Sequence, residues 1–188
     1  MGQTGPTKQS YAREWKLAKQ AASSCYKNFA TEIKKVKQAK DGLTGQQITS
    51  WLSCSPNFIG CYAENEVSTL VITTFPAYLI VNVDGSNLPG SHWIGLMIDR
   101  NNVEIYDSSG FNLFLLPRIP CYLLSFIHRL TQSRKLSVTR QIQPLSSKLC
   151  GFYAMFFIIF RQNFTLSHIS SFFSEKLIKN DRRLINLL

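Results

Sequence analysis

Apolar residues recur every three or four positions in the first part of this 188-residue chain. These positions are Tyr11, Trp15, Ala18, Ala22, Cys25, Phe29, Ile33 and Val36, and Lys and Arg side chains lie between them. This spacing predicts one amphipathic helix that ends near Asp41-Gly42. Its apolar stripe can dock on the rest of the protein, pair with a partner or lie on a membrane surface, and docking is the simplest interpretation.

After residue 42 the pattern changes to short apolar runs separated by turn residues. Thr44-Gly45-Gln46-Gln47 fits a capping box, which predicts a short helix to about Ser53. The residues from Pro56 to Tyr62 are predicted to form a loop. Alternating or continuous apolar runs predict strands at 77–83, 93–99, 103–107 and 136–142, the second and third of them as a hairpin.

Helical spacing returns in the second half of the chain. It predicts a helix at 122–130, after Pro117 and Pro120. It also predicts a last helix that is capped by Ser167 and turns Ile169, Phe172, Phe173 and Leu177 inward. Separate blocks of helices and strands, without repeats, predict the α+β class.

The most apolar run of the chain extends from Cys150 to Phe160, which predicts a buried helix that continues to about Gln162. Cys150 is the first residue of this helix. Free N–H groups and the positive end of the helix dipole favour a thiolate at such a position. Because a thiolate beside an imidazole is a nucleophile, the sequence is interpreted as a cysteine peptidase.

Composition limits the other interpretations. An apolar fraction of 45% and a length of 188 residues indicate one globular domain with a sizeable core. The first residues are polar, and the longest apolar run is about half of the roughly 20 residues that span a bilayer, so neither a secretory leader nor a transmembrane helix is expected. The five cysteines are odd in number and form no C-x-x-C pair, which suggests no disulfide scaffold, no zinc site and a reducing intracellular setting.

The net charge of +10 is concentrated near the beginning of the chain. Residues 1–40 carry nine Lys/Arg and two Glu, a net +7, whereas residues 41–188 contribute +3. A basic segment attracts nucleic acid or an acidic membrane surface, and an ordinary solvated helix face explains the charge equally well.

A cysteine peptidase needs a base, a group that orients the base and a donor for the oxyanion. Of the three histidines, His128 and His168 lie in helical stripes, where packing or surface roles are usual. His92 instead follows a Gly/Pro loop and precedes a strand, so its ring can project at the end of a sheet. Asp107 ends the partner strand of the hairpin, where its carboxylate can accept a hydrogen bond from the imidazole Nδ1.

The oxyanion donor is expected just before the cysteine. Gln143, at the end of the predicted strand, has a side-chain amide that can act beside the backbone N–H of Cys150. Gln141 lies on the same face of that strand, so alternation alone does not separate the two glutamines.

Three short motifs follow one another in a characteristic order. They are Gly-Ser-His-Trp around His92, Tyr-Asp-Ser-Ser-Gly-Phe around Asp107, and the run from Gln143 to Cys150-Gly. Together they resemble the adenovirus protease (adenain) family over about residues 44–165, and Asn57–Tyr62 is similar to another stretch of that family. Related proteases occur in Polinton-type virus-like elements, and the SUMO and ubiquitin-like deconjugases share the same order of active-site residues.

The resemblance implies roles for individual residues. Cys150 would be the nucleophile, His92 the base, Asp107 the orienting acid and Gln143, rather than Gln141, the oxyanion donor. Trp93 would line the cleft and narrow it for small residues such as Gly. The fold implied is papain-like or adenain-like, with a central mixed sheet packed by helices that include the buried helix starting at the nucleophile.

The chain departs from the adenovirus pattern in three places. Asp107 stands where the adenovirus enzymes have Glu, although deconjugases use Asp. Gln132 stands where they have the cysteine that binds an activating peptide, so a disulfide-linked peptide cofactor is not expected. The basic N-terminal segment is an addition, which divides the chain into a helical extension at 1–42 and a peptidase domain at 43–188.

The resemblance implies a cysteine endopeptidase of a virus or virus-like element that cleaves structural precursor proteins inside host cells, in nucleus or cytoplasm, and in virions. The protein is expected to be a monomer. The sequence requires no metal or other cofactor and leaves DNA or a peptide activator open, with residues 1–40 as the predicted nucleic-acid contact. The alternatives are a ubiquitin-like-protein deconjugase, an acyltransferase with the same His-Asp-Gln-Cys site, and a basic nucleic-acid-binding structural protein.

Overall fold

The computed structural model of the chain describes Lys16, residues 42–110 and residues 119–187. Apart from Lys16, which is helical and exposed, the helix predicted from Tyr11 to about Asp41 lies outside the described residues, as does Pro117. The division of the chain at residue 42 therefore stays a prediction.

The centre of the molecule is a mixed sheet with the strand order β1-β2-β3-β4-β5. The strands are β1 (Phe58–Ala63), β2 (Ala77–Asn82), β3 (Trp93–Ile98), β4 (Asn102–Tyr106) and β5 (Lys135–Val138). The middle strand β3 pairs antiparallel with both of its neighbours, β2 and β4, whereas β1 and β5 run parallel to their neighbours at the two edges. The tight β3–β4 hairpin is the predicted one, and it brings the start of β3 close to the end of β4.

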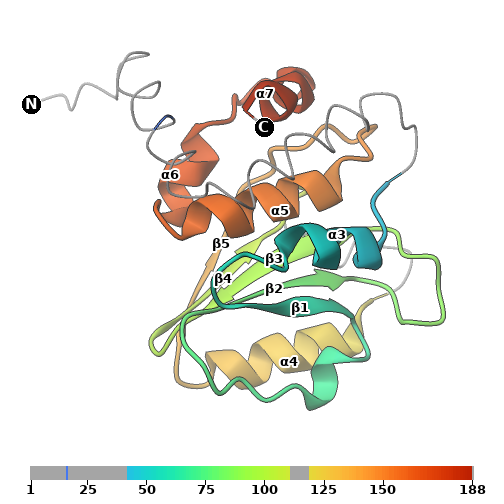
Figure 1. Cartoon of the computed structure of the whole chain (residues 1–188), viewed down its shortest axis with the longest axis vertical. Coiled ribbons are helices and arrows are strands. Elements are labelled where there is room, and N and C mark those ends of the chain that lie inside the picture. Colours follow the sequence, from blue (N-terminus) through green and yellow to red (C-terminus); the bar gives the residue numbers. More distant parts are fainter. Residues whose placement is uncertain (1–15, 17–41, 111–118, 188) are drawn as a thin grey trace, which may run out of the picture.

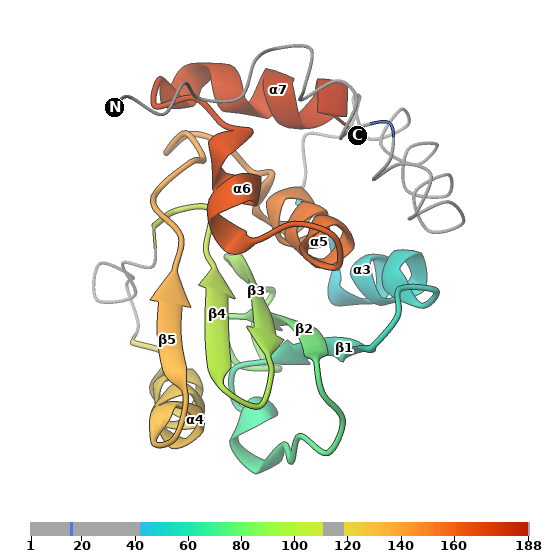
Figure 2. The same ribbon diagram turned by 90° about the vertical axis from the view of Figure 1, so that its left-hand side faces the viewer.

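Helices cover both faces of the sheet (Figure 1). On one face lie α3 (Gly45–Leu52) and α5 (Cys150–Arg161), and on the other lies α4 (Cys121–Thr131). The helices α6 (Leu166–Ser171) and α7 (Asn180–Leu187) form a further layer beyond α5, as Figure 2 shows. Two short 3-10 turns, Val67–Thr69 and Leu177–Lys179, complete the elements of the described residues.

The period of two along each strand separates two cores. On β2, Tyr78 and Ile80 point toward α5, whereas Leu79 and Val81 point toward α4. The core on the α4 side is mainly aliphatic, and the core on the α5 side is rich in aromatic rings. The α+β class, with its mixed sheet and a buried helix that begins at Cys150, is therefore confirmed.

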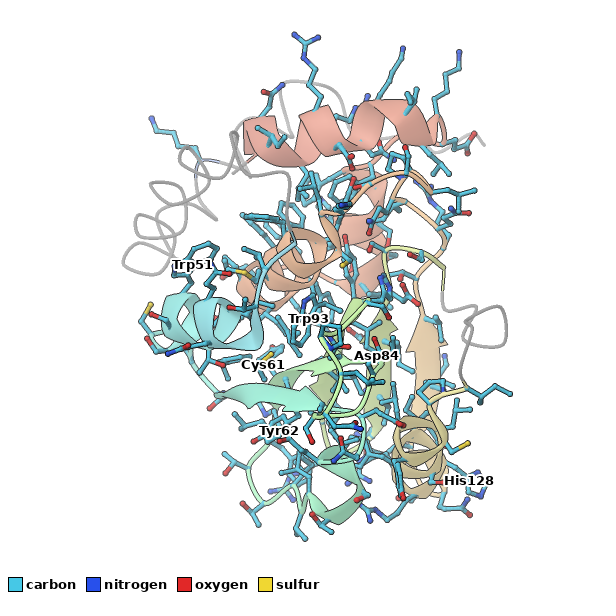
Figure 3. All side chains as sticks on the ribbon, turned by 90° about the vertical axis from the view of Figure 1, so that its right-hand side faces the viewer. Trp51, Cys61, Tyr62, Asp84, Trp93 and His128 are labelled. Atoms are coloured by element: carbon cyan, nitrogen blue, oxygen red, sulfur yellow. The ribbon has the colours of Figure 1, made fainter. Side chains whose placement is uncertain are left out.

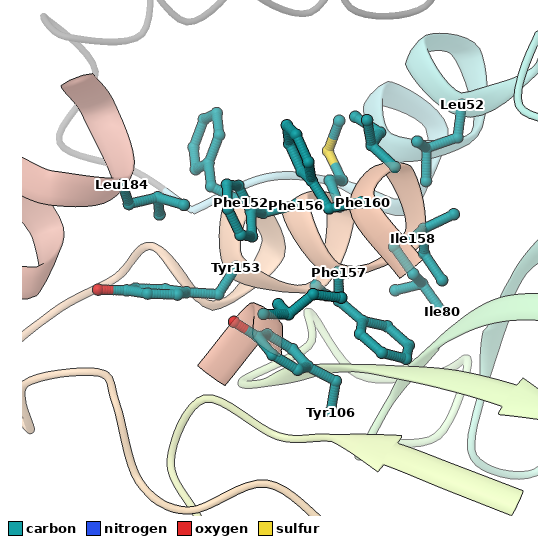
Figure 4. Packing of buried hydrophobic residues seen from close by; sticks show 14 of the residues in the cluster. Leu52, Ile80, Tyr106, Phe152, Tyr153, Phe156, Phe157, Ile158, Phe160 and Leu184 are labelled. Atoms are coloured by element: carbon teal, nitrogen blue, oxygen red, sulfur yellow. The ribbon is translucent and has the colours of Figure 1, made fainter. Parts of the chain in front are cut away.

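A glycine on β3 sets how closely α5 approaches the sheet. A Cβ atom placed on Gly95 would lie 2.8 Å from the ring of Phe157, a separation that packed atoms do not reach. Phe157 in turn stacks on Tyr106 of β4, with ring centroids 4.8 Å apart (Figure 4). Helix α5, which begins at Cys150, thus packs directly on the hairpin whose ends carry His92 and Asp107.

The C-terminal elements hold the segment that leads to α5. The buried side chain of Asn180, at the start of α7, donates 2.8 Å hydrogen bonds to the carbonyls of Ile142 and Ser174. One turn into α5, the Tyr153 hydroxyl donates to the Asp181 carboxylate. Burial, together with the charge of Asp181, raises the pKa of Tyr153 well above its usual value, so this hydroxyl keeps its proton.

Two expectations at the sheet edges were wrong. Residues 58–63 form strand β1 and no loop, because Gly60, with φ of 139°, absorbs a register shift and the flanking residues still pair with β2. The last strand is also shorter than predicted, since β5 ends at Val138. Beyond it the Thr139 N–H still bonds to the Ile105 carbonyl, but Gln143 lies in the loop before α5 and not at a strand end.

Two further expectations concern the helix ends. The capping box at Thr44 is confirmed, since its hydroxyl accepts from the Gln47 N–H and the Gln47 side chain accepts from the Thr44 N–H. The cap of α6 is Thr165 and not Ser167, because the Thr165 hydroxyl accepts the His168 N–H. That helix is also not the last one, because α7 follows it.

The cysteines differ from expectation at one position. Cys54 is disulfide-bonded, although the sequence suggested no disulfide. Cys61, Cys121 and Cys150 are free thiols. None of the helices in the described ranges is both long and apolar enough to cross a membrane.

Candidate active site

The ends of the β3–β4 hairpin bring a histidine and an aspartate together. His92 precedes β3, where its carbonyl accepts the Val83 N–H, and Asp107 directly follows β4. The Nε2 atom of His92 lies 2.7 Å from Oδ1 of Asp107. The His92–Asp107 pair predicted from the sequence is present, but it uses Nε2 of the ring where Nδ1 was expected.

The Asp107 carboxylate is almost completely enclosed, with 2% of its side chain exposed. The same Oδ1 atom that meets His92 also accepts the Ser109 N–H at 2.7 Å. Thr139, which directly follows β5, fixes the backbone of Asp107. Its hydroxyl accepts the Asp107 N–H and donates to the Asp107 carbonyl. The acid is therefore held on both its side chain and its main chain.

The imidazole of His92 is electrostatically unusual. Burial alone would lower its pKa, but hydrogen bonds to Asp107 and Cys150 and the negative charges of both groups outweigh burial and raise the pKa of His92 to about 10. The surroundings of the ring therefore favour its protonated form. A cation in this position can stabilise a thiolate beside it.

Cys150 is the first residue of α5 and is buried, with 8% of the residue exposed. Leu149 stands at the N-cap of this helix and provides no capping side chain, in contrast to the threonines that cap α3 and α6. The N–H groups of the first turn are therefore not used by a cap. These N–H groups, at the positive end of the helix dipole, favour negative charge on the sulfur or on an oxygen next to it.

Gln143 lies in the loop that joins β5 to α5, and it is 5% exposed. Its Oε1 accepts a short hydrogen bond from the Ser108 hydroxyl, and its Nε2 donates to the Ser147 carbonyl at 2.9 Å. A side-chain amide has two N–H donors, so one donor remains beyond the bond to Ser147. Gln141 is half-buried, and its amide donates to the Gln143 carbonyl.

The start of α5 comes into close contact with Trp93 because residue 151 is glycine. A Cβ atom on Gly151 would lie 3.3 Å from the Trp93 ring and 3.2 Å from Leu43. The indole N–H of Trp93 donates to the Leu43 carbonyl at 2.9 Å, which fixes the ring between α3 and β3. The glycine that follows Cys150 therefore allows close packing of the first turn of α5 against Trp93 and Leu43.

One cleft of about 1310 Å³ contains all five residues predicted from the sequence: His92, Trp93, Asp107, Gln143 and Cys150. Its lining comes from the segment before α3 and the start of that helix, from β1, from the loop 84–91 and from the loop 143–148. Three of the residues that line the cleft, Trp93, Cys61 and Asp84, are labelled in Figure 3. The thiol of Cys150 therefore lies on the same cleft as His92, Asp107 and Gln143.

Two buried hydroxyl residues of the site were not singled out in the sequence. Ser108 holds the Gln143 side chain and Thr139 holds the Asp107 backbone, and both are at most 5% exposed. The signal for Ser108 was its position directly after an acid at a strand end. Nothing in the spacing of Thr139 distinguished it from an ordinary residue of the strand predicted at 136–142.

The other histidines lie away from this cleft, as expected. His128 is exposed on α4 beside Gln132, and His168 packs among Phe164 and Phe172. In the part of the chain that the structure describes, no group of three or more His, Cys, Asp or Glu side chains is placed to hold a metal ion.

Comparisons with known proteins give the following result. No protein-family model and no curated protein sequence matches the chain, so no sequence match supports the specific resemblance to adenovirus proteases. Among solved structures, the chain is similar to the ASFV pS273R protease, with 14% identity and a TM-score of 0.47 over 94% of this chain and 85% of that one. It is also similar to the SUMO protease Ulp1 with its catalytic cysteine oxidized to a sulfinic acid, with 14% identity and a TM-score of 0.41 over 98% of this chain and 95% of that one.

Both of these structures are described as proteases. At such low identity and TM-scores, the functional argument for this chain rests on the geometry of its own residues.

Proposed function

We propose that this chain is a cysteine endopeptidase of a virus or virus-like element and that it processes structural precursor proteins. The observation that carries the proposal is that the buried His92–Asp107 pair lies in one cleft with the thiol of Cys150 at the start of α5. The viral assignment rests on the order and spacing of the three motifs that resemble the adenovirus proteases.

The chemistry begins with the Cys150 thiolate and the His92 imidazolium. The sulfur attacks the carbonyl carbon of the scissile peptide, and the carbonyl π electrons move to oxygen to form a tetrahedral oxyanion. The free N–H of Gln143 and the N–H groups at the start of α5 donate to this oxygen. Collapse of the intermediate breaks the C–N bond, the amine leaves with the proton of His92, and a thioester remains on Cys150.

Hydrolysis restores the site. Neutral His92 removes a proton from water, the resulting hydroxide attacks the thioester carbonyl, and a second oxyanion forms at the same donors. The C–S bond then breaks, which releases a carboxylic acid product and returns the thiolate beside the imidazolium. Throughout the cycle Asp107 holds the ring through Nε2 and stabilises its charged form.

Trp93 supports a preference for small residues next to the scissile bond. Its ring packs on Gly151, directly behind the nucleophile, and its N–H is tied to Leu43. A fixed aromatic ring in this position narrows the approach to Cys150, so we propose cleavage at Gly-containing sites.

The three free cysteines provide an internal test of the nucleophile. Cys121 is exposed, Cys150 is buried, and Cys61 lies in the cleft, where burial and the nearby Glu66 raise its pKa to about 12. Simple exposure predicts that iodoacetamide at pH 7 alkylates Cys121 first. An imidazolium-paired thiolate predicts that Cys150 reacts first. Residue-resolved mass spectrometry would measure the order, with Cys150→Ala and His92→Ala as controls, and faster modification of Cys121 would refute the proposal.

Substrates then separate the related activities. We expect a peptide aldehyde or vinyl sulfone with small residues to label Cys150, and precursor-derived peptides to be cleaved. Cleavage of a folded ubiquitin-like precursor in preference to these peptides would indicate a deconjugase. Transfer of acetyl groups from acetyl-CoA to Ser, Thr or Lys would indicate the acyltransferase alternative.

We also propose that nucleic acid is a partner, bound through residues 1–40 with their net +7 charge. Contacts with phosphates release counterions, so the affinity for duplex DNA would fall steeply as salt rises. Replacing the Lys and Arg residues of this segment by Gln would reduce the slope of log Kd against log salt while cleavage of a short peptide persists. An unchanged affinity and slope would make the charge an ordinary solvated surface.

A further inference from the structure

Ser108 lies at the junction of two parts of the site that come from distant segments. It directly follows Asp107, the partner of His92, and its residue is 1% exposed. Its hydroxyl donates to Oε1 of Gln143, thirty-five positions along the chain. Its backbone carbonyl accepts the N–H groups of both Ile142 and Gln143, at 2.9 and 2.8 Å. One residue thus joins the turn that carries the acid to the loop that carries the glutamine.

These bonds determine which end of the Gln143 amide is available. An amide that rotates by half a turn exchanges its oxygen and its nitrogen. Ser108 donates to the oxygen and the Ser147 carbonyl accepts from the nitrogen, so both partners favour the same orientation. In this orientation the remaining N–H is a donor. In the reversed orientation the oxygen would take its place, and a carbonyl oxygen repels an oxyanion.

We propose that Ser108 is a positioning residue that fixes the amide of Gln143 with its N–H directed to the oxyanion. This inference rests on the proposed peptidase function and adds a role that the four-residue constellation does not contain. Ser108 does not touch the reacting atoms, and it acts only through Gln143. Its effect should therefore appear in steps that form an oxyanion and should be absent from steps that do not.

The first measurement compares Ser108→Ala with Ser109→Ala in peptide cleavage. Ser109 is the neighbouring serine but is exposed, and it contacts Asp107 through its backbone N–H. We expect Ser108→Ala to lower kcat about tenfold with KM within about twofold, less than the roughly 10²–10³-fold of a lost oxyanion donor, because Ser147 still favours the correct orientation. Ser109→Ala should stay close to wild type, and Ser108→Thr should recover most of the rate because it keeps the hydroxyl.

The second measurement separates positioning from a general structural role. Alkylation of Cys150 by iodoacetamide forms no oxyanion, so its rate should be the same in Ser108→Ala and wild type. Binding of a peptide aldehyde, which forms a tetrahedral adduct, should weaken about as much as kcat falls. In the Gln143→Ala background, Ser108→Ala should have no further effect on kcat, since both changes act through one amide.

The outcomes distinguish the two proposals. If wild type neither cleaves peptides nor alkylates preferentially at Cys150, the peptidase function itself fails. If wild type is active but Ser108→Ala has the wild-type kcat, slows alkylation as much as cleavage, or multiplies the loss of Gln143→Ala, the role of Ser108 is wrong. Should Ser108→Ala not fold, Ser108→Cys keeps the volume with a much weaker donor and is read by the same kcat comparison.

Discussion

Helices α5 and α4 cover opposite faces of one sheet, yet they are built differently. Every residue of α5 from Cys150 to Phe160 is buried, because α3, α6 and α7 cover the side that faces away from the sheet. In α4 only Leu123, Phe126, Ile127 and Leu130 are buried, and the opposite side faces solvent. A helix that is packed on all sides is held rigidly, and a residue in its first turn is held rigidly with it.

The difference indicates a division of labour between the two faces. The five predicted site residues surround the start of α5, whereas α4 contributes none of them and closes the aliphatic core. Substitutions of the site residues at the start of α5 should therefore lower the rate of cleavage while the free energy of unfolding stays nearly constant. Substitutions in the core beneath α4 should lower the free energy of unfolding while the rate of cleavage stays nearly constant. The predictions below test this separation, beginning with the largest effect.

Cys150→Ala should abolish peptide cleavage and leave the fold intact. The substitution removes the only proposed nucleophile, but it replaces sulfur by hydrogen at the edge of the core, so the loss of packing is small. Cleavage rates and thermal unfolding of the two proteins would measure both effects. Residual cleavage within about tenfold of wild type would exclude a nucleophilic role for Cys150.

His92→Ala should be as inactive as the cysteine variant, whereas Asp107→Asn should keep partial activity. The amide of Asn can still hold the ring, although it no longer stabilises the imidazolium and can favour the wrong tautomer. The comparison uses kcat/KM on one peptide. Normal cleavage by His92→Ala would mean that another histidine, His128 or His168, is the base. Equal losses of kcat/KM in His92→Ala and Asp107→Asn would mean that Asp107 does more than orient the ring.

Gln143→Ala should lower kcat by about 10²–10³-fold, as expected for the loss of one oxyanion donor. Gln141→Ala is the matched control. It removes the same kind of side chain from a half-buried position that lies two residues earlier in the chain. Gln141→Ala should be close to wild type in kcat and KM. The reverse result would assign the donor to Gln141 and would also remove the basis of the role given to Ser108.

Phe126→Ala, on α4, should change catalysis least and stability most. The ring is 1% exposed in the core opposite the site, and truncating such a residue costs about 3–5 kcal/mol of unfolding free energy. The kcat of the folded fraction should remain near wild type, as measured well below the lowered midpoint of unfolding. A large fall in kcat without a fall in stability would show that the two faces of the sheet are coupled.

The sequence predicted those parts of the site that depend on local pattern. The run from Cys150 to Phe160 is too apolar for anything but a buried helix, and the β3–β4 hairpin is bounded by clear turn residues. Once both were placed, the proximity of His92 and Asp107 followed from antiparallel pairing. Strand β1 was missed because Pro56 and Gly60 indicate a break locally, whereas pairing with β2 accommodates the glycine as an irregularity.

Other parts of the site depend on contacts between distant segments. Alternation could not separate Gln143 from Gln141, and only the resemblance favoured Gln143. The structure distinguishes them because the chain leaves the sheet after Val138 and bonds to Ser108 instead. Which ring nitrogen of His92 bonds to Asp107 likewise depends on how the ring is oriented in the folded site. The spacing of residues along the sequence does not determine that orientation.

The bond from Asn180 to the Ile142 carbonyl also bears on the order in which the protein is made. Asn180 comes thirty residues after Cys150, so a ribosome that has just released α5 has not yet released the side chain that holds the loop beside Gln143. We expect a nascent chain stalled at this stage to carry the thiol without an ordered oxyanion loop. Synthesis would then delay full reactivity until α7 has docked, and aldehyde labelling of stalled chains of increasing length would reveal the step.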